Sequence, residues 1–459
     1  MLRRIVLYGF ALAVIALLVA YVTQPIRGYV GPVRIADQPG FGPVLVSPHP
    51  SPTHEPFVAP TPFVHPLQSK TVAELQALLQ AHDPEAQCEM AKRLLKGDGV
   101  DQDWQNGKLL LQVAARQNNP CALTNLGNLS YDVDDYETAS TYYHKAADLD
   151  YPVAFYDLGQ VARYGPAHDE DEAFKQYFEA AKRGYVPAYY LAGTGYITGR
   201  YGAVDKWLAF QWYQLGADAD DQNAIKGLAW YYIYQSDEAD RYQKAMVLLW
   251  KAPCACSDYE IGRLYLKGLG VAPDVHQAAF YFKRAADKGD YPSETAYADL
   301  LRSGKLGASQ PELALRYYRD AADQGDGAAM DAIAQMTERG IGTQRDPALA
   351  HQMYVEAAAH CSGDALFRLA KISLNGSAKH PKDVDEAYAL AETSIMCGYD
   401  PNAGSALLKP LAESGRVNFD RVRQIQQQIQ AKIHDNTGNP NFAPATGMPS
   451  NLTGQKTSS

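Results

Sequence analysis

The chain has 459 residues, of which 46% are apolar, so a large buried core is available. Its formal net charge of -10 argues against nonspecific electrostatic binding of nucleic acid, because such binding needs a basic surface. Six cysteines are too few for a small disulfide scaffold. Tyrosine is unusually frequent, with 31 residues against 13 Phe and 5 Trp.

An uncharged apolar segment, residues 5–22, follows Arg3 and Arg4 at the N-terminus. As a helix it would span roughly 27 Å, close to the ~30 Å hydrocarbon core of a bilayer. The preceding arginines predict that the N-terminus stays cytoplasmic while the rest of the chain crosses the membrane. We therefore expect a signal-anchor transmembrane helix over residues 1–24. A cleaved signal peptide is the main alternative, and a buried soluble helix is a third.

Proline dominates the next segment, with 11 prolines between residues 25 and 66. Proline lacks a backbone N–H and restricts the residue before it, so helix and central strand cannot persist here. We interpret residues 25–69 as an extended proline-rich linker. The alternative is a segment that docks into the groove of a partner.

The middle of the chain repeats one pattern at intervals of roughly 35 residues. Each unit has an apolar first helix, usually a Gly-x-Gly turn, and a second helix that ends in two small residues. The ten units begin near Pro84, Pro120, Pro152, Pro187, Asn223, Asp258, Pro292, Gly327, Asp364 and Pro401, and the tenth is degenerate.

The second helices share an apolar pattern, exemplified by Ala139, Tyr142, Tyr143, Ala146 and Ala147. Spacings of 3, 4, 7 and 8 place such residues on one helical face. We expect the small residues to allow close helix approach and the bulky pair to fill the core beside them.

Signals for helix ends agree with this division. Each Gly-x-Gly turn is expected to end the first helix in the left-handed conformation. The acidic residue after the turn is expected to cap the second helix. The clearest sets are Gly97 to Gly99 with Asp103, Gly268 to Gly270 with Asp274, and Gly340 to Gly342 with Asp346. Thr71 and Glu74 form a capping box that opens an N-terminal capping helix. Residues 419–434 suit a C-terminal capping helix, and residues 437–459 are expected to be a disordered tail.

One hairpin of this kind cannot bury its apolar face alone, whereas stacked neighbours can. The pattern predicts an all-α fold: a right-handed superhelical α/α solenoid of about ten helical-hairpin repeats over residues 70–436, preceded by a single transmembrane helix. The turn "LYLKGLGVAPD" and the helix "AAFYFKRAADKGD" resemble the Sel-one-like repeat, a tetratricopeptide-related unit, over about residues 84–416.

That resemblance implies a non-catalytic scaffold or adaptor. Bacterial members of the family are linked to envelope assembly, exopolysaccharide secretion and host contact. We therefore expect a scaffold in the bacterial inner membrane, single-pass, with its repeat domain in the periplasm and an envelope protein as partner. Direct binding of exopolysaccharide or peptidoglycan is the alternative.

The sequence offers no constellation for catalysis, and we expect no cofactor and no metal. The Gly-x-Gly turns lack the preceding strand and the third glycine of a dinucleotide loop. His360 and Cys361 are adjacent, so on a helix their side chains point about 100° apart and do not suit a shared ligand. The chain is therefore expected not to be an enzyme.

The cysteines allow 15 pairings. Cys361 and Cys397 lie one repeat apart at the ends of second helices, and Cys88 and Cys121 lie in neighbouring first helices. If the domain is exported, these are the two expected bridges, with buried free thiols as the alternative. Cys254 and Cys256 would close only a very small, strained ring, and a metal site there lacks two obvious further ligands.

The remaining aromatic residues gather in the first helices of units four and five. First helices typically line the concave face of this architecture, and tyrosine combines flat contact area with a polar tip. We expect a partner-binding surface made of Tyr189, Tyr190, Tyr196, Trp230, Tyr231, Tyr232 and Tyr234, with packing alone as the alternative.

Overall fold

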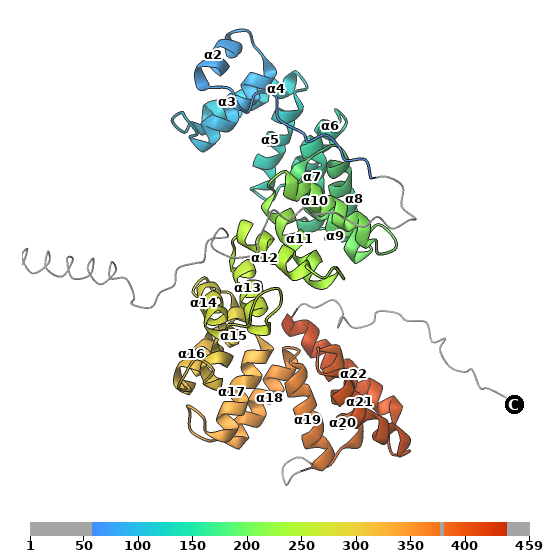
Figure 1. Cartoon of the computed structure of the whole chain (residues 1–459). Helices are drawn as coiled ribbons and strands as arrows, with labels where there is room; N and C mark the ends of the chain where they lie inside the picture. The colour runs from blue at the N-terminus through green and yellow to red at the C-terminus, as the bar shows by residue number, and fades with distance from the viewer. Residues whose placement is uncertain (1–56, 377–380, 438–459) are drawn as a thin grey trace, which may run out of the picture. The chain divides into compact units, whose positions relative to one another are not determined.

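The computed structural model describes residues 57–376 and 381–437, and every regular element in those ranges is a helix (Figure 1). The expected anchor over residues 1–24 and the expected tail beyond residue 437 lie outside the described residues. Within the described ranges, no helix combines the length and apolar character needed to cross a bilayer.

A short helix, α2 (Val72–Gln80), precedes two alternating series of helices. The first helices of the units are α3 (Pro84–Lys96), α5 (Pro120–Tyr131), α7 (Pro152–Tyr164), α9 (Val186–Thr198), α11 (Gln222–Tyr234), α13 (Ala255–Lys267), α15 (Tyr291–Ser303), α17 (Gly327–Arg339), α19 (Gly363–Asn375) and α21 (Pro401–Glu413). The second helices are α4 (Trp104–Arg116), α6 (Tyr136–Ala147), α8 (Glu170–Lys182), α10 (Lys206–Asp218), α12 (Arg241–Lys251), α14 (Val275–Ala286), α16 (Pro311–Asp323), α18 (Pro347–Ala359), α20 (Val384–Met396) and α22 (Phe419–Thr437).

Every first helix begins within three residues of its predicted start, and each of the first nine packs against the second helix that follows it. The fold is therefore an all-α helical repeat solenoid of about ten units. The tenth unit is indeed degenerate, because α22 packs on α20 and α18 rather than on α21. In this position α22 buries Val422 and Ile433 and ends the row of second helices.

The predicted helix ends are confirmed. The Thr71 side chain accepts from the Glu74 amide at 3.3 Å while the Glu74 carboxylate accepts from the Thr71 amide at 2.7 Å. Gly97, the C-cap of α3, has φ 73°, a conformation that costs glycine little. Asp103 then caps α4 by accepting from the Asn106 amide at 3.0 Å.

The predicted core face is confirmed for the second member of the bulky pair, four residues after the alanine, where an aromatic ring is buried in six units: Tyr143, Tyr177, Tyr213, Phe282, Tyr318 and Tyr354. The first member of the pair is buried at Trp212 and Tyr281 but only partly buried at Tyr142, Tyr317 and Met353. In several units the ring of the second member packs on a glycine of the first helix. A Cβ added to Gly159 would lie 2.5 Å from a ring carbon of Tyr177, and one added to Gly262 would lie 2.6 Å from Phe282. Glycine therefore sets the close approach of the two helices.

The described end of the proline-rich segment differs from the expected free linker. Residues 57–70, named the strap here, are extended up to residue 65 but lie against the repeats (Figure 1). The extended backbone follows from proline, as predicted. The docking follows from apolar side chains between the prolines, among them Phe57, Phe63 and Leu67, which the linker interpretation ignored.

Candidate binding surface

Two of the seven aromatic residues expected at a partner surface belong to the core instead. Tyr189 and Tyr232 are both 0% exposed, so neither side chain can reach a ligand in the folded protein. Tyr189 packs on Trp212 at 5.6 Å between ring centroids, and the ammonium of Lys244 lies 5.4 Å from the Tyr232 ring. Helix phase is the reason: each tyrosine falls on the same face as the buried alanines of its helix.

Three more of the seven are only partly exposed. Tyr190 packs against Tyr213 at 5.9 Å, Tyr196 against Tyr201 at 5.0 Å, and Tyr231 against Phe210 at 5.3 Å. These rings fill contacts inside or between units four and five.

Trp230 and Tyr234 are the exposed members of the predicted set, at 42% and 52%. They are four residues apart on α11, so they lie on the same side of that helix. The Tyr234 hydroxyl donates to a carboxylate oxygen of Glu260 at 2.9 Å and also contacts Arg263, both on α13. Partial burial and the Glu260 charge raise the pKa of Tyr234, which therefore stays a neutral donor.

The strap crosses several units before it reaches α2. Phe57 meets Trp212 of unit four edge to face at 5.1 Å, and Phe63 meets Tyr151, the N-cap of α7, at 5.4 Å. The Phe63 amide donates to the carbonyl of Gly184, in the turn between α8 and α9, at 2.8 Å. Because successive side chains of an extended chain alternate, Phe63 faces the repeats while Val64 is 71% exposed.

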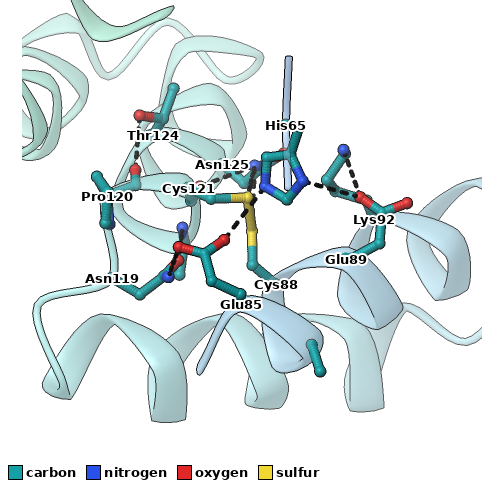
Figure 2. The surroundings of a disulfide bond; sticks show 12 residues. His65, Glu85, Cys88, Glu89, Lys92, Asn119, Pro120, Cys121, Thr124 and Asn125 are labelled. Atoms are coloured by element: carbon teal, nitrogen blue, oxygen red, sulfur yellow. Dashed lines mark hydrogen bonds and ion pairs between the residues drawn. A yellow bond between two sulfur atoms is a disulfide. The ribbon is translucent and has the colours of Figure 1, made fainter. Parts of the chain in front are cut away.

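His65 continues the strap into unit one, where its ring lies between two carboxylates beside a disulfide (Figure 2). It is 8% exposed, with Nε2 3.4 Å from Glu85 and Nδ1 3.8 Å from Glu89. Glu89 is already paired with Lys92 at 2.7 Å. Burial and the positive charge of Lys92 lower the pKa of His65, so the ring is neutral at pH 7.

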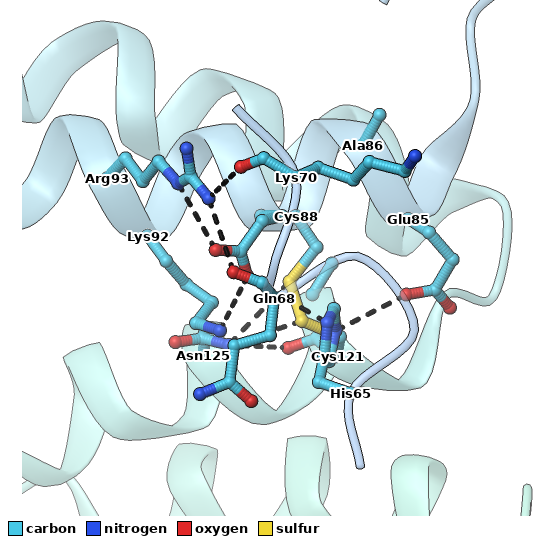
Figure 3. Close-up of polar contacts among 12 residues, drawn as sticks. His65, Gln68, Lys70, Glu85, Ala86, Cys88, Lys92, Arg93, Cys121 and Asn125 are labelled. Carbon is cyan, nitrogen blue, oxygen red and sulfur yellow. Dashed lines mark hydrogen bonds and ion pairs between the residues drawn. A yellow bond between two sulfur atoms is a disulfide. The ribbon is translucent and has the colours of Figure 1, made fainter. Parts of the chain in front are cut away.

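An arginine fixes the last residues of the strap (Figure 3). Arg93 of α3 donates to the carbonyls of Lys70 at 2.5 Å and Gln68 at 3.4 Å, and its Nε lies 3.3 Å from Glu89. A guanidinium suits this task because it offers several donors in a rigid plane. The strap is therefore held by apolar contacts at one end and by charge-assisted hydrogen bonds at the other.

The structure forms both expected cystine bridges and a third. Cys88–Cys121 joins α3 to α5 and is buried, and Cys361–Cys397 joins the ends of α18 and α20. Cys254 and Cys256, for which the sequence suggested only a strained ring, are bonded to each other at the start of α13. Disulfides persist in oxidising compartments, so three of them indicate an extracytoplasmic location.

Asp157 on α7 is a site residue that the sequence did not reveal. Its Oδ2 atom is buried and has no hydrogen-bond partner among the described residues. Burial raises the pKa of this carboxyl to about 7. Its charge in turn helps to raise the pKa of Tyr143, Tyr151 and Tyr185. The only sequence signal was an acidic residue at a position inside an apolar helix, which is ambiguous.

Two curated proteins are similar to part of this chain. The chain shares 32% identity over 179 residues with an uncharacterized protein of Neisseria meningitidis serogroup B, and 29% over 146 residues with chitin synthase regulatory factor 3 of Schizosaccharomyces pombe. The matched segments cover 38% and 30% of this chain. They cover only 36% and 16% of those two relatives.

Two solved structures are matched at low sequence identity. The c5321 protective antigen present in uropathogenic Escherichia coli strains, displaying an SLR fold, is 18% identical, with a TM-score of 0.46 over 85% of this chain and 92% of the other. A Sel1 repeat protein from Oxalobacter formigenes is 22% identical, with a TM-score of 0.47 over 70% of this chain and 93% of the other.

The family model for the Sel1 repeat matches seven segments, residues 84–119, 126–151, 186–221, 257–290, 293–326, 327–360 and 363–399. Together these segments make up more than half of the chain, and they coincide with helical hairpins of the structure. Units three, five and ten are repeats by their fold alone. The chain therefore belongs to the Sel1 repeat family and is a repeat scaffold protein.

Proposed function

We propose that this protein is a non-catalytic scaffold of the bacterial cell envelope, anchored in the inner membrane by residues 1–24, whose repeat domain in the periplasm binds partner proteins. Sel1 repeat proteins are generally non-catalytic, and the disulfides support an extracytoplasmic repeat domain. The anchor is supported by the uncharged run of residues 5–22 behind two arginines.

The observation that carries the choice of a protein as ligand is the docked strap. An extended peptide with two phenylalanine anchors and a backbone hydrogen bond to Gly184 already lies across units one to four. Trp230 and Tyr234, on α11 of unit five, add two exposed aromatic side chains. We place the partner surface there, on units five and six.

The partner's chemistry follows from the residues at that surface. Trp230 and Tyr234 offer aromatic faces, and Glu260 with Arg263 offers one charge of each sign next to them. Aromatic and arginine side chains dominate protein interfaces energetically. The acidic balance of the chain favours a partner with basic or aromatic anchors.

Direct binding of exopolysaccharide or peptidoglycan is the second candidate. The observation in its favour is the spacing of Trp230 and Tyr234 by one helical turn, because exposed aromatic faces stack on sugar rings. The burial of Tyr189 and Tyr232 counts against the broad tyrosine platform first expected for this role.

The test is photo-crosslinking from the full-length protein in its native membranes. A photoreactive residue replaces Trp230 in one variant and Leu349, a 42% exposed residue of α18, in a matched control. One envelope protein crosslinked from position 230 but not from position 349 supports the scaffold. Crosslinks to glycan alone from position 230 overturn it in favour of polysaccharide binding. A chain without residues 1–24 then shows whether placement in the membrane is needed.

A further inference from the structure

The short disulfide at the start of α13 has a setting different from the other two. Cys88–Cys121 and Cys361–Cys397 each join two repeats, with sequence separations of 33 and 36, whereas Cys254–Cys256 spans a separation of 2 and joins nothing beyond one helical turn. Both of its cysteines are partly exposed, as are Cys361 and Cys397, whereas Cys88 and Cys121 are buried. A bond of this kind has little to contribute to the fold, because closing so short a loop removes little chain entropy.

Cys254 also occupies the N-cap of α13, a helix of 13 residues. Its sulfur accepts a hydrogen bond from the Ser257 amide at 3.1 Å. The Ser257 hydroxyl, 3.2 Å from the same sulfur, donates to the Ala252 carbonyl at 2.6 Å. Negative charge on the Cys254 sulfur is therefore stabilised by an amide donor and by the helix dipole.

The charges around the pair do not oppose that negative charge. Asp258 follows in the first turn of α13 but is paired with Arg284, at 2.9 Å from Nε, and with Lys288 at 3.2 Å. Lys251 lies three residues before Cys254 and pairs with Asp220 at 2.6 Å. Within residues 57–376 and 381–437, no cluster of three His, Cys, Asp or Glu side chains suits a metal ion, so a metal site does not explain the pair.

We propose that Cys254 and Cys256 form a redox-active site that exchanges with accessible disulfides or dithiols of other proteins. In the reduced site, the Cys254 thiolate attacks one sulfur of a substrate disulfide, forms a mixed disulfide and releases the other substrate sulfur as a thiolate. The Cys256 thiolate then attacks the Cys254 sulfur, re-forms the Cys254–Cys256 bond and releases the second substrate thiolate. Two electrons pass to the substrate, and the reverse sequence oxidises a substrate dithiol.

The first test compares the cystines of the full-length protein equilibrated in glutathione buffers of increasing reducing strength. Acid quenching, alkylation and mass spectrometry report each cystine, and trypsin places Cys254 and Cys256 on one peptide, residues 252–263. Cys254–Cys256 is expected to be reduced reversibly at glutathione ratios that leave Cys88–Cys121 fully oxidised. A short disulfide that outlasts Cys88–Cys121 overturns the proposal.

The second test assigns the attacking sulfur. With glutathione disulfide as probe, Cys256→Ser, which keeps Cys254, is expected to form the mixed disulfide at least about tenfold faster than Cys254→Ser, since only Cys254 has the N-cap position. Equal rates, or a faster Cys254→Ser variant, contradict the assignment. Thermal unfolding of each variant, followed by circular dichroism, must remain a cooperative transition that begins above the assay temperature, so that a failure to fold is not mistaken for lost reactivity.

Discussion

The hydroxyl of Tyr143 on α6 donates a 2.7 Å hydrogen bond to Oδ1 of Asn128 on α5, while the ring of this tyrosine packs on Gly127. A tyrosine of the second helix thus packs its ring on a glycine of the first helix. Its hydroxyl forms a hydrogen bond with the polar residue that follows this glycine. The same arrangement recurs for Tyr177 on Gly159 and Gln160, and for Tyr213 on Gly193 and Thr194.

This contact predicts that Gly→Ala lowers the free energy of unfolding at Gly127, although the same substitution raises it at an exposed helical position. Gly→Ala at an exposed helical position stabilises by about 1 kcal/mol. At Gly127 the new Cβ would lie 2.4 Å from Cε1 of Tyr143, so Gly127→Ala is expected to destabilise by about 1–3 kcal/mol. Tyr143→Phe, which removes only the hydrogen bond, should cost about 1 kcal/mol. Chemical denaturation followed by circular dichroism measures both, and a stabilised Gly127→Ala variant would contradict the close approach.

The strap supplies a second prediction with a matched control. Gly184 and Gly289 occupy equivalent turns, with φ 82° and 79°, so alanine is equally strained at both. A Cβ on Gly184 would lie 1.9 Å from the carbonyl oxygen of Thr61, whereas one on Gly289 meets nothing within 4 Å. Gly184→Ala is therefore expected to release the strap, and Gly289→Ala is not. Limited proteolysis should cut residues 57–70 at least about tenfold faster in the first variant, which corresponds to about 1.4 kcal/mol of lost docking energy.

If both variants are cut at the same rate, the strap does not depend on its contact with Gly184. The truncation of both anchors, Phe57→Ala with Phe63→Ala, is an independent check. It removes the ring contacts to Trp212 and Tyr151 without touching the repeats.

Docking of the strap is also expected to depend on pH. The pKa of buried His65 lies below its ordinary value of 6.5, so the docked strap holds fewer protons than the released strap. Docking is fully present above about pH 6.5 and weakens as the pH falls below it. Burial raises the pKa of Glu85, which acts in the opposite sense, and the charge of Glu89 is paired with Lys92 and Arg93.

Hydrogen exchange of residues 57–70 at pH 7.5 and pH 5.5, corrected for the intrinsic rate, measures this dependence. His65→Gln keeps a polar side chain but cannot titrate, so its protection should fall less between pH 7.5 and pH 5.5 than that of the parent chain. Equal pH dependence in the parent chain and in His65→Gln would exclude His65 as the titrating group.

Cys88–Cys121 and Cys254–Cys256 are expected to differ in how much each contributes to the free energy of unfolding. Replacing both Cys88 and Cys121 by Ser is expected to cost about 3–4 kcal/mol, because the bridge closes a loop of 33 residues. Replacing both Cys254 and Cys256 by Ser returns almost no conformational entropy to the unfolded chain, because the bridge closes so short a loop. This double substitution should therefore cost less than about 2 kcal/mol. Thermal unfolding of the two double variants under oxidising conditions measures the difference. A larger loss for the short pair would assign it a structural role.

The sequence predicted the features that depend on local pattern. Unit boundaries, the Thr71 cap, the capping role of Asp103 and the buried second-helix aromatics all follow from periodicity and turn chemistry, which are properties of neighbouring residues. The strap was missed because its contacts join residues far apart: Phe57 and Trp212 are separated by more than four repeats. Tyr189 and Tyr232 were wrongly assigned to the binding surface. Neighbouring aromatic residues on one helix differ in burial according to the face on which each lies, and the composition of the segment does not reveal that face.

Asp157 gives the last prediction, because its carboxyl titrates near neutrality in the fold. Burial raises its pKa from 3.8 to about 7, so the folded state holds the proton more tightly than the unfolded state. This contribution to stability is fully present below about pH 4 and is lost as the pH rises to about 7. Asp157→Asn removes the charge and is expected to stabilise the protein on the order of 2 kcal/mol at pH 8, with little effect at pH 4.5. Thermal midpoints across pH 4.5–8 measure the gain, and a variant destabilised equally at both ends would mean that the Asp157 carboxylate is stabilised by its surroundings after all.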